Sequence, residues 1–197
     1  DPEIFEKTYF KEEDVKSRMH ETAYLNPNLT IIYEDRRKDE VEHIEYHEPD
    51  GIIGFVKDLN KNIDTVHDVI YFKGENDGIT VEAAIQYTAE FHENILGFCN
   101  NIYNAEGGTH ITGYKTAMTT IINAYARELG ILKEKDVNFT GADVRNGMTA
   151  VISIKHPDPR FEGQTKTKLD NPDASRVTSK ITADEMQLFF DKNLETL

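Results

Sequence analysis

Residues 79–87 read Ile-Thr-Val-Glu-Ala-Ala-Ile-Gln-Tyr, and apolar side chains stand at 79, 81, 83 and 85. Successive side chains of a β-strand point to opposite faces of the sheet, so this alternation predicts a strand with one buried face. Val69–Phe72 is a second β-rich run, and the segment 74–78 between the two runs contains two glycines, which predicts a hairpin. A sheet with one buried face is therefore the centre of the expected fold.

Helices are expected to cover that sheet. From about Thr112 to Leu129 the apolar side chains recur at three- and four-residue spacing, and Gly130 is a typical C-terminal stop. The other expected elements are helices over Lys11–Asn26, Ile52–Leu59 and Asp173–Asn193 (interrupted near Thr182), a helical turn over Ala142–Asn146, a hairpin of Leu29–Tyr33 and Val41–Tyr46, strands over Ile95–Ile102 and Met148–Ile154, and a loop over Lys155–Lys168. No Ser- or Gly-rich linker interrupts the chain, so the sequence predicts one α+β domain.

Length and composition exclude several classes of protein. The chain has 197 residues, 38% of them hydrophobic, which is enough for a packed core and excludes a disordered tail. No apolar run is long enough for a transmembrane helix. The single cysteine, Cys99, excludes an internal disulfide and a cysteine zinc site, and it suits a reducing cytoplasm. The first residues lack both a starting Met and a signal-peptide pattern, so we expect a piece of a longer chain.

The formal charge of −14 is unevenly distributed. Residues 1–110 hold 24 Asp and Glu against 10 Lys and Arg, whereas residues 111–197 hold 12 of each. Non-specific coating of nucleic acid needs surplus Lys and Arg, so an acidic total argues against it. A local cationic site, if present, is expected after residue 111.

One cationic candidate is the segment Phe161–Leu169, which reads Phe-Glu-Gly-Gln-Thr-Lys-Thr-Lys-Leu. Gly163 permits a sharp backbone excursion, and residues 164–168 supply several hydrogen-bond donors and two positive charges. A Lys ammonium beside an amide donor suits a terminal phosphate. The alternative is a solvated loop, because no Walker-type spacing accompanies it.

A second candidate is Glu106–His110, with two adjacent glycines before the long helix. Consecutive N–H groups at a helix start can hold an anion, although such a segment more often forms a tight turn with a packed histidine. His43, Glu45 and His47 share one face of a strand, and a solvated surface explains them better than a metal site. We expect Cys99 to be a buried small hydrophobe and assign no metal ligands.

Taken in order, several segments resemble the second domain of the bacterial DNA gyrase B family. They are 1–5, 106–110, 141–154 and 161–169, and the resemblance covers essentially the whole chain. The run Gly-Gln-Thr-Lys-Thr-Lys-Leu at 163–169 is highly specific to the ATPase subunits of type II topoisomerases. Topoisomerase IV has a similar subunit, but Phe98-Cys-Asn-Asn-Ile102 and Asn171 match gyrase better.

The resemblance implies a fold and a place in a larger protein. Residues 1–197 would be the transducer domain, a β-sheet covered by helices with a left-handed βαβ crossover. An ATP-binding domain and a metal-binding, DNA-cleaving domain would flank it and are absent from this chain. The whole enzyme would be cytoplasmic and would introduce negative supercoils into DNA at the expense of ATP.

The resemblance also implies site residues and partners. Lys166 would contact the γ-phosphate of ATP, and Gln164 would assist it, so that the loop senses the nucleotide. ATP would be bound mainly by the absent N-terminal domain, and Mg²⁺ would be needed only in the full-length protein. The implied partners are the gyrase A subunit, DNA, a second B protomer and the neighbouring domains. The isolated domain is expected to be inactive.

Three alternatives stay open at this point. The chain could be the same domain of topoisomerase IV. It could be an interaction module whose lysine loop binds DNA phosphates, which predicts salt-sensitive DNA binding. It could also be a translation-type domain that shares only the fold and binds RNA.

Overall fold

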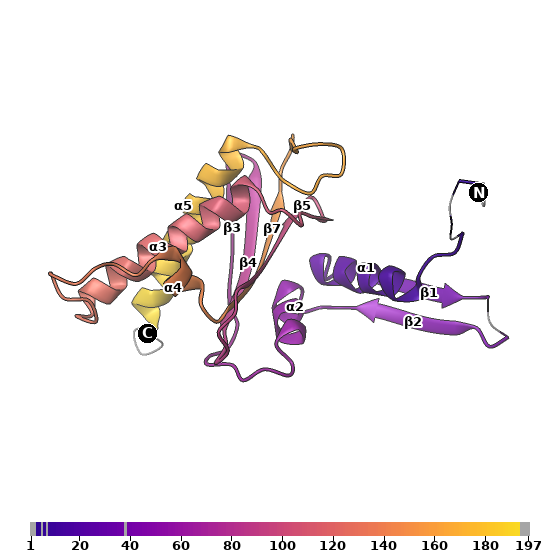
Figure 1. Cartoon of the computed structure of the whole chain (residues 1–197), viewed down its shortest axis with the longest axis horizontal. Helices are drawn as coiled ribbons and strands as arrows, with labels where there is room; N and C mark the ends of the chain where they lie inside the picture. Colours follow the sequence, from indigo (N-terminus) through magenta and orange to yellow (C-terminus); the bar gives the residue numbers. More distant parts are fainter. Residues whose placement is uncertain (1–2, 5, 7, 38, 194–197) are drawn as a thin grey trace. The chain divides into compact units, whose positions relative to one another are not determined.

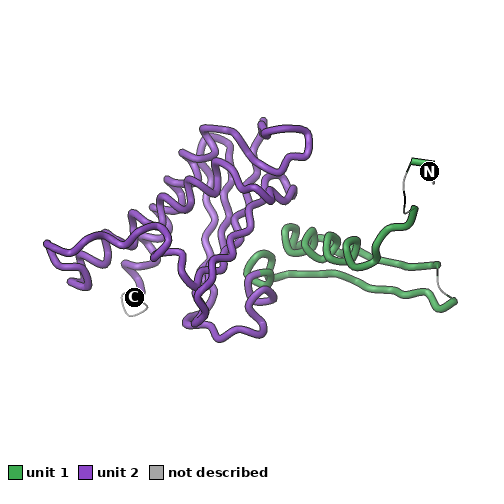
Figure 2. Tube along the Cα trace, in the orientation of Figure 1, with its two compact units in different colours: residues 1–55 green, residues 56–197 purple. Residues whose placement is uncertain are grey.

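The computed structural model describes residues 3–4, 6, 8–37 and 39–193, with helices and strands labelled in Figure 1. The segment 1–5, which contributes to the resemblance, lies partly outside the described residues. The chain divides into two compact units, residues 1–55 and 56–197 (Figure 2). The assignment of residues 1–197 to one transducer domain stays a prediction. The boundary falls inside helix α2 (Ile52–Leu59) instead of a Ser- or Gly-rich linker, so composition gave no sign of it.

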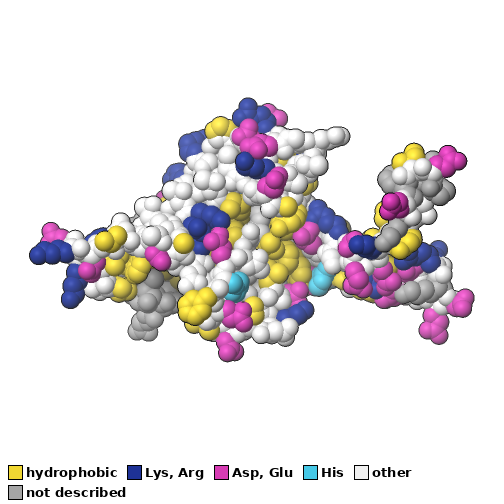
Figure 3. All heavy atoms as spheres, in the orientation of Figure 1, with side chains coloured by type: hydrophobic (Ala, Val, Ile, Leu, Met, Phe, Trp, Pro, Cys, Tyr) yellow, Lys and Arg dark blue, Asp and Glu magenta, His cyan; other side chains and the backbone are white. Residues whose placement is uncertain are grey.

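In unit 1, helix α1 (Glu12–Leu25) packs on an antiparallel hairpin of β1 (Thr30–Asp35) and β2 (Glu42–His47). The expected helix and hairpin are confirmed. His43, Glu45 and His47 form the exposed face of β2, so the solvated-surface interpretation holds for them. The sequence of this unit carries 15 Asp and Glu against 7 Lys and Arg, and acidic side chains gather on its visible surface in Figure 3.

Unit 2 is built on a five-stranded mixed sheet. Its strands are β3 (Ile70–Asn76), β4 (Ile79–Tyr87), β5 (Asn94–Cys99), β6 (Ile102–Tyr103) and β7 (Met148–Lys155), in the order β3-β4-β7-β5-β6. β4 pairs antiparallel with β3 and β7, whereas β5 runs parallel to β7. The alternating apolar side chains of β4 are all at most 1% exposed, as the pattern predicted.

Helices α3 (Thr109–Glu128) and α5 (Pro172–Lys192) pack against each other and against that sheet (Figure 1). Between α3 and β7 stands the short helix α4 (Gly141–Arg145), whose Thr140 and Asp143 form a capping box. The α+β class is confirmed. The interruption expected near Thr182 is wrong, because α5 is continuous and Thr182 is fully buried.

The path from β5 through α3 to its parallel neighbour β7 is the βαβ crossover that the resemblance implied. The left-handedness of this crossover stays a prediction. At the crossing of the two long helices, a Cβ on Gly113 would lie 2.3 Å from the Ser175 carbonyl oxygen, so only glycine permits this close approach.

A single strand over Ile95–Ile102 was expected, and the structure corrects it. β5 ends at Cys99, and β6 folds back antiparallel to it, with Phe98 opposite Tyr103. Asn100 and Asn101 form the turn with φ of +50° and +64°. Asparagine tolerates this left-handed region better than other residues with side chains, so the Asn-Asn pair permits the hairpin turn.

No helix in the described part of the chain is long and apolar enough to cross a membrane.

Candidate functional site

The segment Phe161–Leu169 forms a loop whose two ends are joined at its base. Phe161 and Leu169 form an antiparallel bridge, and the Glu162 N–H donates to the Lys168 carbonyl at 2.9 Å. Gly163 has φ +79°, with open space where a Cβ would stand, and it begins the excursion as the sequence predicted. Gln164 and Lys166 lie exposed on the part of the loop beyond this base.

The chain entering and leaving the loop is held by buried and half-buried side chains. Both backbone groups of His156 bond the Asn100 amide, and the Asn171 side chain bonds the backbone of Arg160 and Asp158. His156 Nδ1 accepts from the Asp158 N–H, so its Nε2 carries the proton and donates to Asp173 at 3.0 Å. This bond lowers the pKa of the Asp173 carboxyl. The loop therefore projects from a fixed base between β7 and α5.

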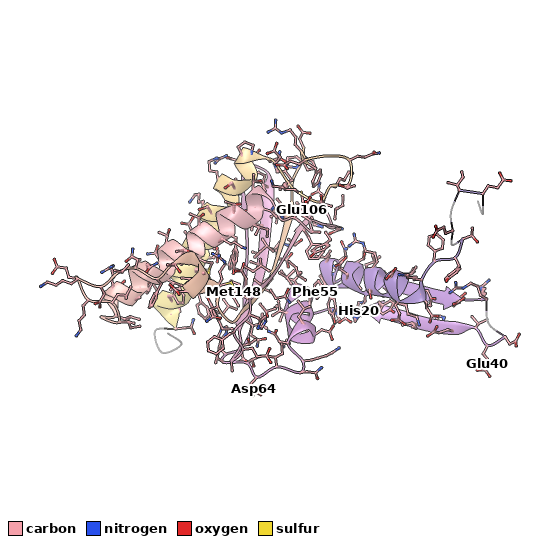
Figure 4. All side chains as sticks on the ribbon, in the orientation of Figure 1. His20, Glu40, Phe55, Asp64, Glu106 and Met148 are labelled. Atoms are coloured by element: carbon pink, nitrogen blue, oxygen red, sulfur yellow. The ribbon has the colours of Figure 1, made fainter. Side chains whose placement is uncertain are left out.

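The two segments that the sequence offered as separate candidates meet in the structure. The Glu106 N–H donates to the Thr167 carbonyl at 2.9 Å, and the Thr167 hydroxyl donates to the Glu106 carboxylate at 2.5 Å. Gly108 and Leu169 form a parallel bridge. Glu106, labelled in Figure 4, marks this turn ahead of α3, and the loop between β7 and α5 reaches the same end of the sheet (Figure 1).

The glycines at 107 and 108 serve this docking. The Gly107 N–H donates to the Asn104 carbonyl, and the Thr109 N–H donates to the Leu169 carbonyl. A Cβ on Gly108 would lie 2.4 Å from the Leu169 carbonyl oxygen. The structural interpretation of Glu106–His110 is therefore the one that the geometry supports.

The two lysines of the loop differ in their surroundings. Lys168 pairs with Glu162 at 3.0 Å, and this carboxylate raises the pKa of Lys168. Lys166 has no carboxylate within 4 Å among the described residues, and its Nζ lies 5.9 Å from the centre of the Phe161 ring. The Gln164 amide has no hydrogen-bond partner within the described part of the chain. The loop therefore presents a cation that no carboxylate of the described residues neutralises. Beside it stands an amide donor that has no hydrogen-bond partner among them.

Comparison with protein families gives one decisive match. The model of the family described as DNA gyrase B matches residues 51–197. The chain belongs to the DNA gyrase B family. The family suggested by the sequence is thereby confirmed, whereas the transducer label stays a prediction.

Curated members of the gyrase B family align along nearly the whole chain. The DNA gyrase B subunits of Enterococcus faecalis and Streptococcus pneumoniae are 48% and 46% identical over 195 residues, or 98% of this chain. The chain spans only 30% of the length of these relatives.

Solved structures agree on the fold. The 43K ATPase domain of Thermus thermophilus gyrase B superposes with a TM-score of 0.83 at 31% identity, covering all of this chain and 52% of that one. The gyrase B subunit of Myxococcus xanthus gives 0.79 at 26% identity, covering 93% of this chain and 58% of that one. A topoisomerase IV domain of Francisella tularensis gives 0.82 at 23% identity, a likeness of fold alone.

His110 lies in the first turn of α3 as a fully buried residue. Neither ring nitrogen has a hydrogen-bond partner in the described part of the chain, and burial lowers its pKa to about 4. Cys99 is likewise fully buried, as expected, and burial raises the pKa of its thiol to about 12. The described residues contain no group of three His, Cys, Asp or Glu placed to hold a metal ion.

We predict that buried His110 makes the chain less stable in mild acid. The unfolded histidine titrates near 6.5 and the folded one near 4, so below 6.5 the unfolded state binds the extra proton. The free energy of unfolding keeps its full value above pH 6.5 and falls as the pH drops toward 4. The loss at pH 5 is about 2 kcal/mol. Urea unfolding at pH 7 and pH 5 measures the loss of unfolding free energy between the two pH values. In His110→Leu this loss should be about 2 kcal/mol smaller than in the wild type. An equal difference in both proteins would contradict the prediction.

Asn104 contacts the candidate loop, and the sequence did not indicate this contact. It is 2% exposed, and its amide Nδ2 donates to the Lys166 carbonyl at 2.8 Å across 62 residues of sequence. An asparagine two residues before Glu106 is typical of a turn, and nothing in its position pointed to the distant loop.

Proposed function

We propose that this chain is the transducer region of a type II DNA topoisomerase subunit, specifically of DNA gyrase B. In this role it senses the γ-phosphate of ATP through Lys166 and Gln164. The observation that carries the proposal is the pair of lysines: Lys168 is neutralised by Glu162, whereas Lys166 is exposed with no carboxylate partner among the described residues. An ammonium left in this state is suited to an anion supplied from outside.

The residues present fit a terminal phosphate. Lys166 offers a charged donor and Gln164 a neutral one, from neighbouring positions of one loop. Bonds of a charged donor to phosphate contribute roughly 1.5–3 kcal/mol each. ATP would supply the free energy of its hydrolysis, while this chain would contribute binding at the phosphate end.

The anchoring of the loop gives such a contact a consequence elsewhere in the molecule. The loop is bonded at Thr167 and Leu169 to the turn that starts α3, and α3 packs along α5. A contact made by Lys166 with triphosphate and lost with diphosphate would favour one of two domain orientations by its differential energy. At ~1.5–3 kcal/mol, the population changes by about tenfold or more.

In this role the chain would be one part of a longer subunit. A neighbouring domain would bind ATP and Mg²⁺, and a metal-binding domain would take part in DNA cleavage. The gyrase A subunit, DNA and a second B protomer would complete an enzyme that introduces negative supercoils in the cytoplasm. Alone, this chain would not hydrolyse ATP.

Amine labelling tests the proposed contact in the complete subunit. A non-hydrolysable ATP analogue is expected to slow the acylation of Lys166 several-fold relative to ADP, because the ammonium would then be engaged by the γ-phosphate. Lys168 serves as an internal control, because its ammonium is already paired with the Glu162 carboxylate. Mass spectrometry of the peptides measures both rates, and equal Lys166 labelling under the two nucleotides would contradict the proposal.

A further inference from the structure

The backbone of Lys166 lies in a region that disfavours side chains. Its φ is +57°, and the other residues with side chains and positive φ in the described chain are Asn and Asp. Lysine gains no local hydrogen bond from its own side chain in this conformation, so the surrounding structure must hold it there.

The Asn104 amide makes the contact that holds this residue. Its Nδ2 donates to the Lys166 carbonyl at 2.8 Å. The backbone of Asn104 is itself fixed, because its N–H donates to the Gly97 carbonyl of β5 and its carbonyl accepts from the Gly107 N–H, both at 2.8 Å. The direction of the Lys166 peptide is thus tied to the edge of the sheet.

Asn104 holds this position at a cost. Its Oδ1 is buried and has no partner within the described residues, and an unpaired buried acceptor is unfavourable. An apolar residue would avoid that cost in the turn but would leave the Lys166 carbonyl without its donor. The neighbouring loop residue, Thr167, is held separately by Glu106.

We infer that Asn104 is the positioning residue for Lys166. It sets the direction in which the lysine side chain leaves the loop. The inference rests on the proposed function of Lys166. Without the Asn104 amide, residue 166 is free to relax out of the left-handed region, and its Cβ and ammonium then point elsewhere. A misplacement of about 1 Å at a reacting group can cost on the order of 100-fold in rate.

The test compares two buried asparagines in the complete subunit. Asn104→Ala is expected to lower kcat for ATP hydrolysis about tenfold or more, with KM for ATP within about twofold of wild type. Asn123→Ala is the matched control. Asn123 is also buried, and its Nδ2 also donates to backbone carbonyls, of Thr119 and Phe139, but it does not contact the loop. Its kcat should be unchanged.

Labelling of Lys166 measures its protection by the nucleotide, which a loss of stability alone would not change. Protection of Lys166 by the non-hydrolysable ATP analogue should disappear in Asn104→Ala and persist in Asn123→Ala. If Asn104→Ala does not fold, the near-isosteric Asn104→Asp, which lacks the donor, is expected to behave in the same way. Full protection in the folded Asn104 variant would overturn the inference. Absence of protection in the wild type would instead overturn the proposed function.

Discussion

Replacing Lys166 with alanine in the complete subunit is expected to lower kcat for ATP hydrolysis by about 100-fold or more. Removing one preorganised donor from a developing charge commonly costs 10²–10³-fold, and Lys166 is the loop cation that no carboxylate of the described chain neutralises. Nucleotide binding should be largely retained, since the proposal assigns most of the ATP contacts to another domain. Steady-state hydrolysis and equilibrium nucleotide binding, measured on the same preparation, check both statements.

Lys168→Ala is the control for this prediction, because it removes the same charge two residues further along the loop. The Lys168 ammonium already bonds the Glu162 carboxylate, and an exposed pair of this kind contributes ~0–1 kcal/mol to stability. Its kcat should stay within about threefold of wild type. Near-normal turnover in Lys166→Ala, or equal losses in the two variants, would refute the role given to Lys166.

Local patterns predicted most of the elements because each pattern reflects which side chains of that segment are buried. The alternation at 79–87 and the helical spacing at 112–129 arise from one buried face, and both appear as an element of that type. The failures have local causes too. The paired left-handed residues Asn100 and Asn101 reverse the chain within a run that otherwise has the composition of one strand.

Only part of the candidate site could be predicted from the sequence. The Gln164–Lys166 motif was identifiable from a resemblance, and Gly163 from its conformational freedom. The docking of the loop on the turn at 104–108 was not, because its hydrogen bonds join residues about 60 positions apart and most use backbone atoms, which carry no sequence signal. The exceptions are the bond between the Thr167 and Glu106 side chains and the bond from the Asn104 amide. An asparagine beside a glycine pair has a sufficient local explanation as a turn residue.

Gly108→Ala tests that docking directly, and we expect it to lower the free energy of unfolding of unit 2 by about 2–6 kcal/mol. The added Cβ would lie 2.4 and 2.5 Å from the backbone oxygen and nitrogen of Leu169, so one of the two segments must move. Overpacking of this kind costs ~1–3 kcal/mol, and the φ of +137° adds a further ~1–3 kcal/mol for a residue with a side chain.

Gly78→Ala separates these two contributions. Gly78 also has a positive φ, +73°, but a Cβ there would meet nothing within 4 Å. Its substitution should therefore cost only the backbone term, about 1 kcal/mol. Urea unfolding of the two variants, followed by far-ultraviolet circular dichroism, measures the difference. If the Cβ displaces the loop as the geometry requires, hydrogen exchange at the Thr109 amide, which donates to the Leu169 carbonyl, should accelerate in Gly108→Ala and not in Gly78→Ala. Equal destabilisation of both variants would mean that the turn and the loop are not in close contact, and the coupling between Lys166 and α3 would then lose its structural basis.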